Sequence, residues 1–192
     1  MKIFLIRHGI TDWNKLGKLQ GREDIPLNAE GEKQAECCGI SLKKSKISFA
    51  VSSPLKRAVK TAEIICKILN IDAPIIDEGF IERDYANLSG TIIKDIFKPR
   101  EEGSGMEPIE TLGDRMINAI LKYAESADSD FAVVSHGGSI NAVLKTLSNG
   151  EIGSGKTRLK NACVCILEYE NEKLKISGYN LDPEETEKMI TR

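Results

Sequence analysis

Runs of hydrophobic residues alternate with amphipathic segments from one end of the chain to the other. Short apolar runs beside turn-forming residues are typical of buried strands, and apolar residues three or four positions apart are typical of helices with one buried face. When such segments alternate, helices usually cover both faces of a mostly parallel sheet. The pattern therefore predicts an α/β fold, built as a three-layer α/β/α sandwich.

The same pattern locates the individual elements. The predicted strands are residues 2–6, 49–52, 73–76 and 131–134, followed by a hairpin of residues 162–168 and 174–177 with its turn at Asn171. The predicted helices are residues 29–44 behind the N-cap Asn28, 54–69 opened by Pro54, 109–127 and 139–147, with a frayed helix after Pro183. Residues 80–105 are predicted to form a mobile loop with a short helical candidate at residues 92–97, because they contain Pro99 and a Gly-Ser-Gly string.

Length and composition limit the class of protein. The chain has 192 residues, of which 41% are hydrophobic and 29% charged, and a formal net charge of -2. These values predict a single domain spanning residues 1–192 and argue against a nucleic-acid partner. The apolar run at the N-terminus is too short for a signal peptide or a membrane span. We therefore expect a cytoplasmic protein without a membrane partner, and its oligomeric state stays open.

The cysteines suggest neither a disulfide framework nor a metal site. The chain has five, an odd number, and the pairs Cys37/Cys38 and Cys163/Cys165 match neither zinc-ligand spacing nor a CxxC redox motif. We expect them to be buried thiols. No cysteine or carboxylate lies at a ligating spacing from either histidine, so no metal or other cofactor is expected.

The chain contains only two histidines, and both follow predicted strands. His8 stands in the string Arg7-His8-Gly9, and His136 stands in Ser135-His136-Gly137-Gly138. A lone histidine is more often an ordinary buried side chain than a functional group. However, ligands of parallel sheets bind beyond the carboxyl ends of the strands, where glycines let a ligand approach the backbone. The two histidines are therefore predicted to share one site.

A third string adds positive charge to this site. Arg57 lies near the start of the predicted helix that Pro54 opens, where free amides and a guanidinium can bind phosphate oxygens together. Taken alone, Arg57 could equally be a solvated surface residue, but beside Arg7 and His8 it indicates an anion site. A neutral His8 can attack phosphorus if its other ring nitrogen donates to a fixed acceptor, for which we expect a backbone carbonyl.

A departing alkoxide also needs a proton, and Glu82 is the candidate donor. It lies where the chain leaves the third predicted strand and enters the predicted loop. Asp84 is a rival for the same role, and from chemistry alone a plain surface carboxylate is a third interpretation.

These strings together resemble the histidine phosphatase superfamily, in the branch related to cofactor-dependent phosphoglycerate mutases. The resemblance covers nearly the whole chain and is most specific in residues 5–9, 53–58 and 134–138. It implies that His8 is the phosphorylated nucleophile, that Glu82 is the proton donor, and that the remaining pocket residues bind phosphate and substrate. Those pocket residues are Arg7, Asn14, Gln20, Gly21, Arg57, His136 and Gly137.

Some positions depart from the family pattern. Ala86 and Ser89 stand where the family often has glycine and glutamate, and Asn141 stands where it often has arginine. No reacting group is lost, so we expect a phosphatase of small phosphorylated metabolites, with the preferred substrate left open. A mutase is disfavoured because the span between Glu82 and His136 is short and has only three arginines, at positions 83, 100 and 115. A sensor that binds phosphate without turnover is a further alternative.

One further motif, in residues 150–157, does not predict a nucleotide site. Residues 150–157 spell the P-loop pattern GxxxxGK[ST], but that loop needs a strand before it and a helix after it. Here the predicted order is reversed, so we expect a surface connection rather than a nucleotide site.

Overall fold

The computed structural model describes residues 1–92 and 105–191. Six strands form one sheet in the order β3-β2-β4-β1-β5-β6. The strands are β1 (Lys2–Arg7), β2 (Ile47–Ser52), β3 (Ile75–Ile76), β4 (Asp130–Ser135), β5 (Val164–Glu170) and β6 (Lys173–Leu181). The first four strands in that order run parallel to their neighbours, whereas β5 is antiparallel to both β1 and β6. The mostly parallel sheet expected from the sequence is confirmed.

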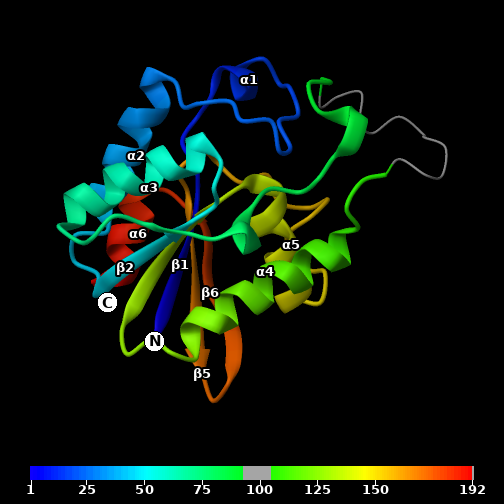
Figure 1. The fold of residues 1–192 in the computed structure, drawn as a ribbon. Coiled ribbons are helices and arrows are strands. Elements are labelled where there is room, and N and C mark those ends of the chain that lie inside the picture. Colours follow the sequence, from blue (N-terminus) through cyan, green and yellow to red (C-terminus); the bar gives the residue numbers. More distant parts are fainter. Residues whose placement is uncertain (93–104, 192) are drawn as a thin grey trace.

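Helices cover both faces of this sheet (Figure 1). On one face lie α2 (Ala29–Ser41), α3 (Lys56–Leu69) and α6 (Pro183–Ile190), and on the other lie α4 (Ile109–Ala124) and α5 (Gly137–Leu147). Strand β1 contributes side chains to the hydrophobic core on both faces of the sheet. Ile3 and Leu5 pack with α4 and α5, whereas Phe4 and Ile6 pack with α2 and α3. Each such buried side chain stabilises the fold by roughly 1.5–3 kcal/mol. The three-layer sandwich is therefore confirmed.

The register of the central strands determines where the site lies. Arg7 at the end of β1 pairs with Ser135 at the end of β4, and Ser52 at the end of β2 pairs with Val134. The residues that follow these three strands therefore emerge side by side at one edge of the sheet.

Two short helices differ from expectation. Helix α1 (Asp12–Lys15) was not predicted, and it is stabilised by a capping box between Thr11 and Asn14. Helix α6 is not frayed, because a second capping box at its start combines with the packing of Met189 against the core. A four-residue helix gives almost no periodic signal, so its cap is the only sequence evidence for it.

The predicted loop of residues 80–105 is partly regular where it is described. It includes the end of the 3₁₀ turn η1 (Glu78–Phe80), a second turn η2 (Ala86–Leu88), and a β-bridge between Lys18 and Ile92. Apart from Ile92, the helical candidate at residues 92–97 lies outside the described residues.

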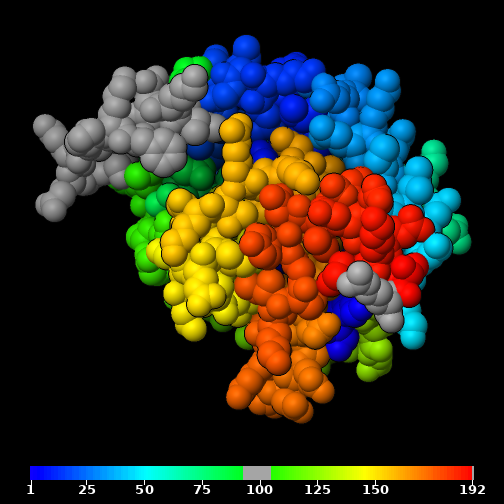
Figure 2. Space-filling view, turned by 180° about the vertical axis from the view of Figure 1, so that it is seen from behind, coloured from blue at the N-terminus to red at the C-terminus, as the bar shows by residue number. Residues whose placement is uncertain are grey.

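Other expectations have mixed outcomes. Four of the five cysteines are buried as free thiols, but Cys37 is exposed on α2. The P-loop-like residues 150–157 follow α5 and precede β5, as expected, and Figure 2 shows this yellow segment at the surface beside the orange β6. No helix in the described part of the chain combines the length and apolar composition that crossing a bilayer requires.

Candidate active site

The two histidines meet at the carboxyl edge of the sheet. His8 follows β1 and His136 follows β4, and the ring centroids are 5.2 Å apart with the planes inclined at 59°. Both side chains are buried. The adjacency follows from the parallel register of β1 and β4 rather than from any contact between neighbours in sequence.

The His8 ring has one defined orientation. Its Nδ1 lies 2.7 Å from the carbonyl oxygen of Gly9, and a carbonyl can only accept a hydrogen bond, so Nδ1 carries the proton. The amide of Gly9 in turn donates to the hydroxyl of Thr61 at 3.1 Å. The neutral ring therefore has its lone pair on Nε2, which is the arrangement that nucleophilic attack requires.

His136 is oriented from the opposite ring nitrogen. Its Nε2 lies 2.7 Å from the hydroxyl of Ser53, which follows β2. Its Nδ1 is buried and has no hydrogen-bond partner among residues 1–92 and 105–191. When the hydroxyl donates to Nε2, the ring proton lies on Nδ1, and that atom is then a donor for an incoming anion. Ser53 is a functional candidate that the sequence analysis quoted within a motif without giving it a role.

Both imidazoles are neutral at neutral pH. Burial and the nearby positive charge of Arg57 lower the pKa of His8 well below its usual value, and the charge of Arg7 adds to the effect. The pKa of His136 is lowered for the same first two reasons. Neutral His8 has a free lone pair without prior deprotonation.

The two arginines are held by backbone carbonyls. Arg57 donates from Nη1 to the carbonyl of Glu23 at 2.6 Å and from Nη2 to that of Gly21 at 2.7 Å. Arg7 donates from Nη1 to the carbonyl of Leu159. The Nε atoms of Arg7 and Arg57 are buried without a partner in the described part of the chain. Two cations therefore present fixed, unused donors, which is an arrangement suited to phosphate.

The start of α3 differs from what the sequence suggested. The amide of Lys56, at the first helical position, donates to the carboxylate of Asp24 at 2.7 Å, and the amide of Leu55 lies 3.4 Å from the Ser53 hydroxyl. These amides are therefore occupied by protein groups. Arg57 contributes to the site through its side chain rather than through the helix terminus.

Glu82 lies against the amino end of α5. Its Oε1 accepts from the amides of Arg83 and Ser139 at 2.8 and 2.9 Å, and the Ser139 hydroxyl lies 3.0 Å both from this oxygen and from the carbonyl of Ile81. In the described part of the chain, Oε2 accepts from the amide of Gly138 alone, at 3.1 Å. The carboxyl group is buried. Its rival Asp84 lies outside this cluster, since its carboxylate is about half exposed and faces Arg22.

The remaining candidate residues are Asn14, Gln20, Gly21 and Gly137. Asn14 accepts through Oδ1 from Thr11 and Asn161, and Gln20 accepts through Oε1 from the Thr11 hydroxyl, so their amide NH2 groups remain for a ligand. Gly21 acts through its carbonyl, which holds Arg57. A side chain at Gly137 would come within 3.3 Å of the Arg7 Nε, so only glycine leaves that donor accessible.

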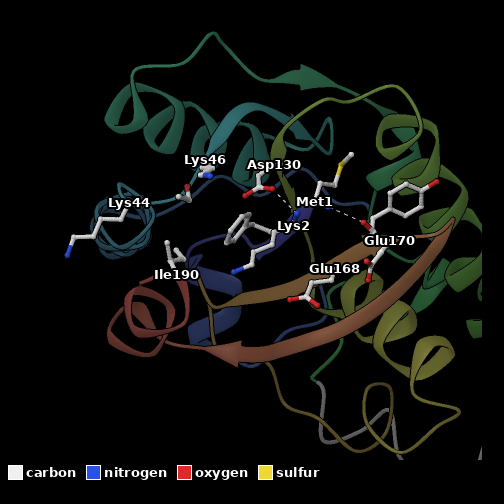
Figure 3. Close-up of a pocket in the computed structure, with 11 residues that line it drawn as sticks. Met1, Lys2, Lys44, Lys46, Asp130, Glu168, Glu170 and Ile190 are labelled. Carbon is white, nitrogen blue, oxygen red and sulfur yellow. Dashed lines mark hydrogen bonds between the residues drawn. The ribbon is translucent and has the colours of Figure 1, made fainter. Parts of the chain in front are cut away.

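Other features of the structure lie away from these residues. A hollow of about 480 Å³ opens at the amino ends of β1 and β4, at the other end of the sheet, and is lined by lysines and acidic residues (Figure 3). It contains neither histidine. Among the described residues no cluster of three or more His, Cys, Asp or Glu side chains is arranged to hold a metal ion.

Comparisons with known proteins agree with the family resemblance. The model of the histidine phosphatase superfamily (branch 1) matches residues 3–182. The uncharacterized phosphatase PhoE of Bacillus subtilis (strain 168) is 40% identical over 184 residues, which cover 94% of each chain. The probable phosphoglycerate mutase GpmB of Salmonella choleraesuis (strain SC-B67) is 30% identical over 195 residues, covering 93% of this chain and 90% of that one.

A solved structure of a phosphatase also resembles this chain. Phosphoserine phosphatase from Entamoeba histolytica, in complex with 3-phosphoglyceric acid, superposes with a TM-score of 0.82 at 26% identity, covering 94% of this chain and 96% of that one.

Proposed function

The chain belongs to the histidine phosphatase superfamily (branch 1), and from this membership and the site geometry we propose that it hydrolyses small phosphomonoesters through a phosphohistidine on His8. The observation that carries the proposal is the pair of buried neutral imidazoles, with the His8 Nε2 lone pair free and two arginine Nε atoms unpartnered beside them. A phosphoryl group needs a nucleophile and fixed positive charge on its oxygens, and these residues supply both.

The proposed first step transfers the phosphoryl group to the protein. The Nε2 lone pair of His8 forms a bond to phosphorus while the bond from phosphorus to the ester oxygen breaks. Arg7, Arg57 and the Nδ1–H of His136 donate to the three non-bridging oxygens, where the charge of the transition state lies. Glu82 gives its proton to the departing oxygen, and Oε2 is the atom that can carry that proton because Oε1 already accepts from two backbone amides, whereas Oε2 accepts from one.

The second step regenerates the enzyme. Water attacks phosphorus and gives a proton to the Glu82 carboxylate, and the bond between phosphorus and Nε2 breaks. Inorganic phosphate leaves, and His8 returns to its neutral form. No metal or other cofactor takes part in the proposal, because the arginines and His136 supply the donors that the phosphoryl oxygens need.

Hydrolysis is proposed over mutase activity for two reasons. PhoE, the relative at 40% identity, is named a phosphatase, whereas the relative at 30% identity is named a probable mutase. In addition, Arg83 and Arg115 already donate to Glu107 and to backbone carbonyls, so these two cations are engaged within the protein. A mutase would need free cations to retain a phosphorylated intermediate.

The proposal is tested by assaying released phosphate. We expect p-nitrophenyl phosphate to be hydrolysed at the same rate with and without a chelator, and activity to be lost in His8→Ala. A panel that includes phosphoserine and 3-phosphoglycerate should identify the preferred ester, since the similar Entamoeba phosphatase is named for the first and was solved with the second. Activity that depends on added magnesium would contradict the proposal. Faster interconversion of 2- and 3-phosphoglycerate than phosphate release would favour the mutase.

A further inference from the structure

Glu82 lies in a short segment without regular secondary structure. Residues 81–85 follow η1 and precede η2, so their backbone groups have no helix or sheet ladder to bond with. Glu82 is buried and its neighbours are partly buried, so the polar backbone groups here need partners, and side chains supply many of them. Which side chains do so determines where the Glu82 carboxyl group lies.

Two arginines bind carbonyls within this segment and next to it. Arg115 on α4 donates from Nη1 to the carbonyls of Gly79 at 2.8 Å and Ile81 at 3.1 Å. Arg22 donates from Nε to the carbonyl of Glu82 itself at 3.3 Å. Arginine donors thus hold the backbone before Glu82, at Gly79 and Ile81, and at the Glu82 carbonyl itself.

Glu107 connects the two arginines. Its Oε1 and Oε2 each lie 3.0 Å from a nitrogen of Arg115, and Oε2 lies 3.5 Å from Nη2 of Arg22. It also exchanges bonds with Asp84, whose amide donates to Oε2 at 3.2 Å and whose carbonyl accepts from the Glu107 amide at 2.9 Å. Its side chain is only 11% exposed. Although burial alone would raise the pKa of Glu107, the Arg115 contact and the Asp84 amide hold it below its usual value.

We propose that Glu107, acting through Arg115 and Arg22, is the positioning residue for the general acid Glu82. The inference rests on the proposed function, because it assigns Glu107 no contact with substrate and no effect except through the proton donor. If the Glu107 charge is removed, Arg115 loses the anion that orients it, and Arg22 keeps only the carboxylate of Asp84 at 3.6 Å. The arginine donors to the carbonyls of Gly79, Ile81 and Glu82 are then no longer fixed. A displacement of about 1 Å in a catalytic group can cost roughly 100-fold in rate.

The positioning role of Glu107 is tested by the ratio of the kcat/KM values for two substrates. For each variant, kcat/KM is measured for p-nitrophenyl phosphate, whose leaving group needs no proton, and for glycerol phosphate, whose alkoxide does. The ratio does not depend on the fraction of folded protein in the sample. Glu82→Gln should raise the ratio by about 100-fold or more, since general acids contribute 10²–10⁴-fold. Glu107→Gln should raise it by about 10-fold to 100-fold.

A matched control and a double variant complete the design. Glu110 lies in the first turn of α4 with its side chain 75% exposed, and among the described residues it pairs with Lys145 alone, so Glu110→Gln should leave the ratio at the wild-type value. In the double variant Glu82→Gln/Glu107→Gln, the ratio should equal that of Glu82→Gln alone, because no acid remains to be positioned. Arg22→Lys provides the same readout if Glu107→Gln does not fold, since Arg22 is more exposed.

The outcomes separate this inference from the proposed function. If Glu82→Gln raises the ratio but Glu107→Gln leaves it unchanged, or if the two effects multiply in the double variant, the positioning role is wrong and the acid assignment stands. If Glu82→Gln itself leaves the ratio unchanged, the acid assignment fails and the inference fails with it.

Discussion

The Nδ1 atom of His8 lies 2.7 Å from the carbonyl oxygen of Gly9, the residue that follows it in the chain. Gly9 is itself held in place in two ways. Its amide donates to Thr61, and its backbone packs so closely on α2 that a Cβ on Gly9 would come within 2.3 Å of the Gly31 carbonyl oxygen. The orientation of the predicted nucleophile therefore depends on the close approach of α2 to the end of β1. His136, in contrast, is oriented by the Ser53 hydroxyl, which can be removed without changing the backbone.

We expect Ser53→Ala to lower kcat/KM by about 5-fold, since a hydrogen bond of this kind contributes about 1 kcal/mol. The loss should be equal for aryl and alkyl phosphates, because the tautomer of His136 affects phosphate binding and not the leaving group. Ser52→Ala is the matched control, as this equally buried hydroxyl donates only to the Ser53 carbonyl. Wild-type kinetics in Ser53→Ala would show that the hydroxyl does not set the tautomer.

Arg57→Lys should lower kcat/KM by roughly 100-fold, because the three donors of an ammonium share one nitrogen, whereas the guanidinium reaches the Gly21 and Glu23 carbonyls and a phosphate oxygen from three separate nitrogens. The factor should be the same for p-nitrophenyl phosphate and glycerol phosphate. Steady-state kinetics with both substrates check this. A loss confined to one substrate would mean that Arg57 acts on the leaving group rather than on the phosphoryl oxygens.

Stability should depend on pH through the two histidines. The folded-state pKa of each is below the usual value of 6.5, so the unfolded chain binds more protons as the pH falls below that value. Stability is therefore fully present above about pH 6.5 and decreases as pH falls toward the folded-state pKa values, by up to about 1.4 kcal/mol per pH unit for each histidine.

Urea denaturation between pH 7 and pH 5.5 measures this effect. The double variant His8→Asn/His136→Asn has no histidine left, so its free energy of unfolding should change much less over the same window. Equal slopes for the wild type and the double variant would contradict the assignment of two neutral buried imidazoles.

Lys156→Ala should leave phosphatase activity unchanged. The Lys156 ammonium donates to the Gly150 carbonyl within the same segment, and no strand–loop–helix order surrounds it. Thermal unfolding with added ATP is the second measurement, and we expect no shift in Tm for either protein. A shift in the wild type that Lys156→Ala abolishes would show that residues 150–157 bind nucleotide after all.

The fold was largely predictable because its elements have strong local signals. The buried run of β1 and the Asn28 cap of α2 both lie where the sequence placed them. Helix α1 was missed because four residues show no periodicity, and α6 was judged frayed because part of its stability depends on packing against α2, which is distant in sequence. Ends of elements also differ from the prediction, as at α3, which begins at Lys56 rather than at Pro54.

The site was predictable only in part. Strand-end strings indicated His8, His136 and Arg57, because a parallel sheet gathers such positions at one edge. The hydroxyl of Ser53 and the carboxylate of Glu107 carry no such signal, since their importance arises from contacts with residues far away in the chain. Ser53 lies in the family-like string of residues 53–58, but only the folded structure shows what its hydroxyl contacts, and the same holds for the Glu107 carboxylate.

The most direct test of the account is to trap the covalent intermediate. Wild-type protein turning over a phosphomonoester is quenched in alkali, digested, and analysed by mass spectrometry for phosphorylated peptides. The account predicts a phosphoryl group on His8 that is stable in base, is lost in acid, and is absent from His8→Asn. Full turnover without any phosphohistidine, or a phosphoryl group found on His136 instead, would contradict it.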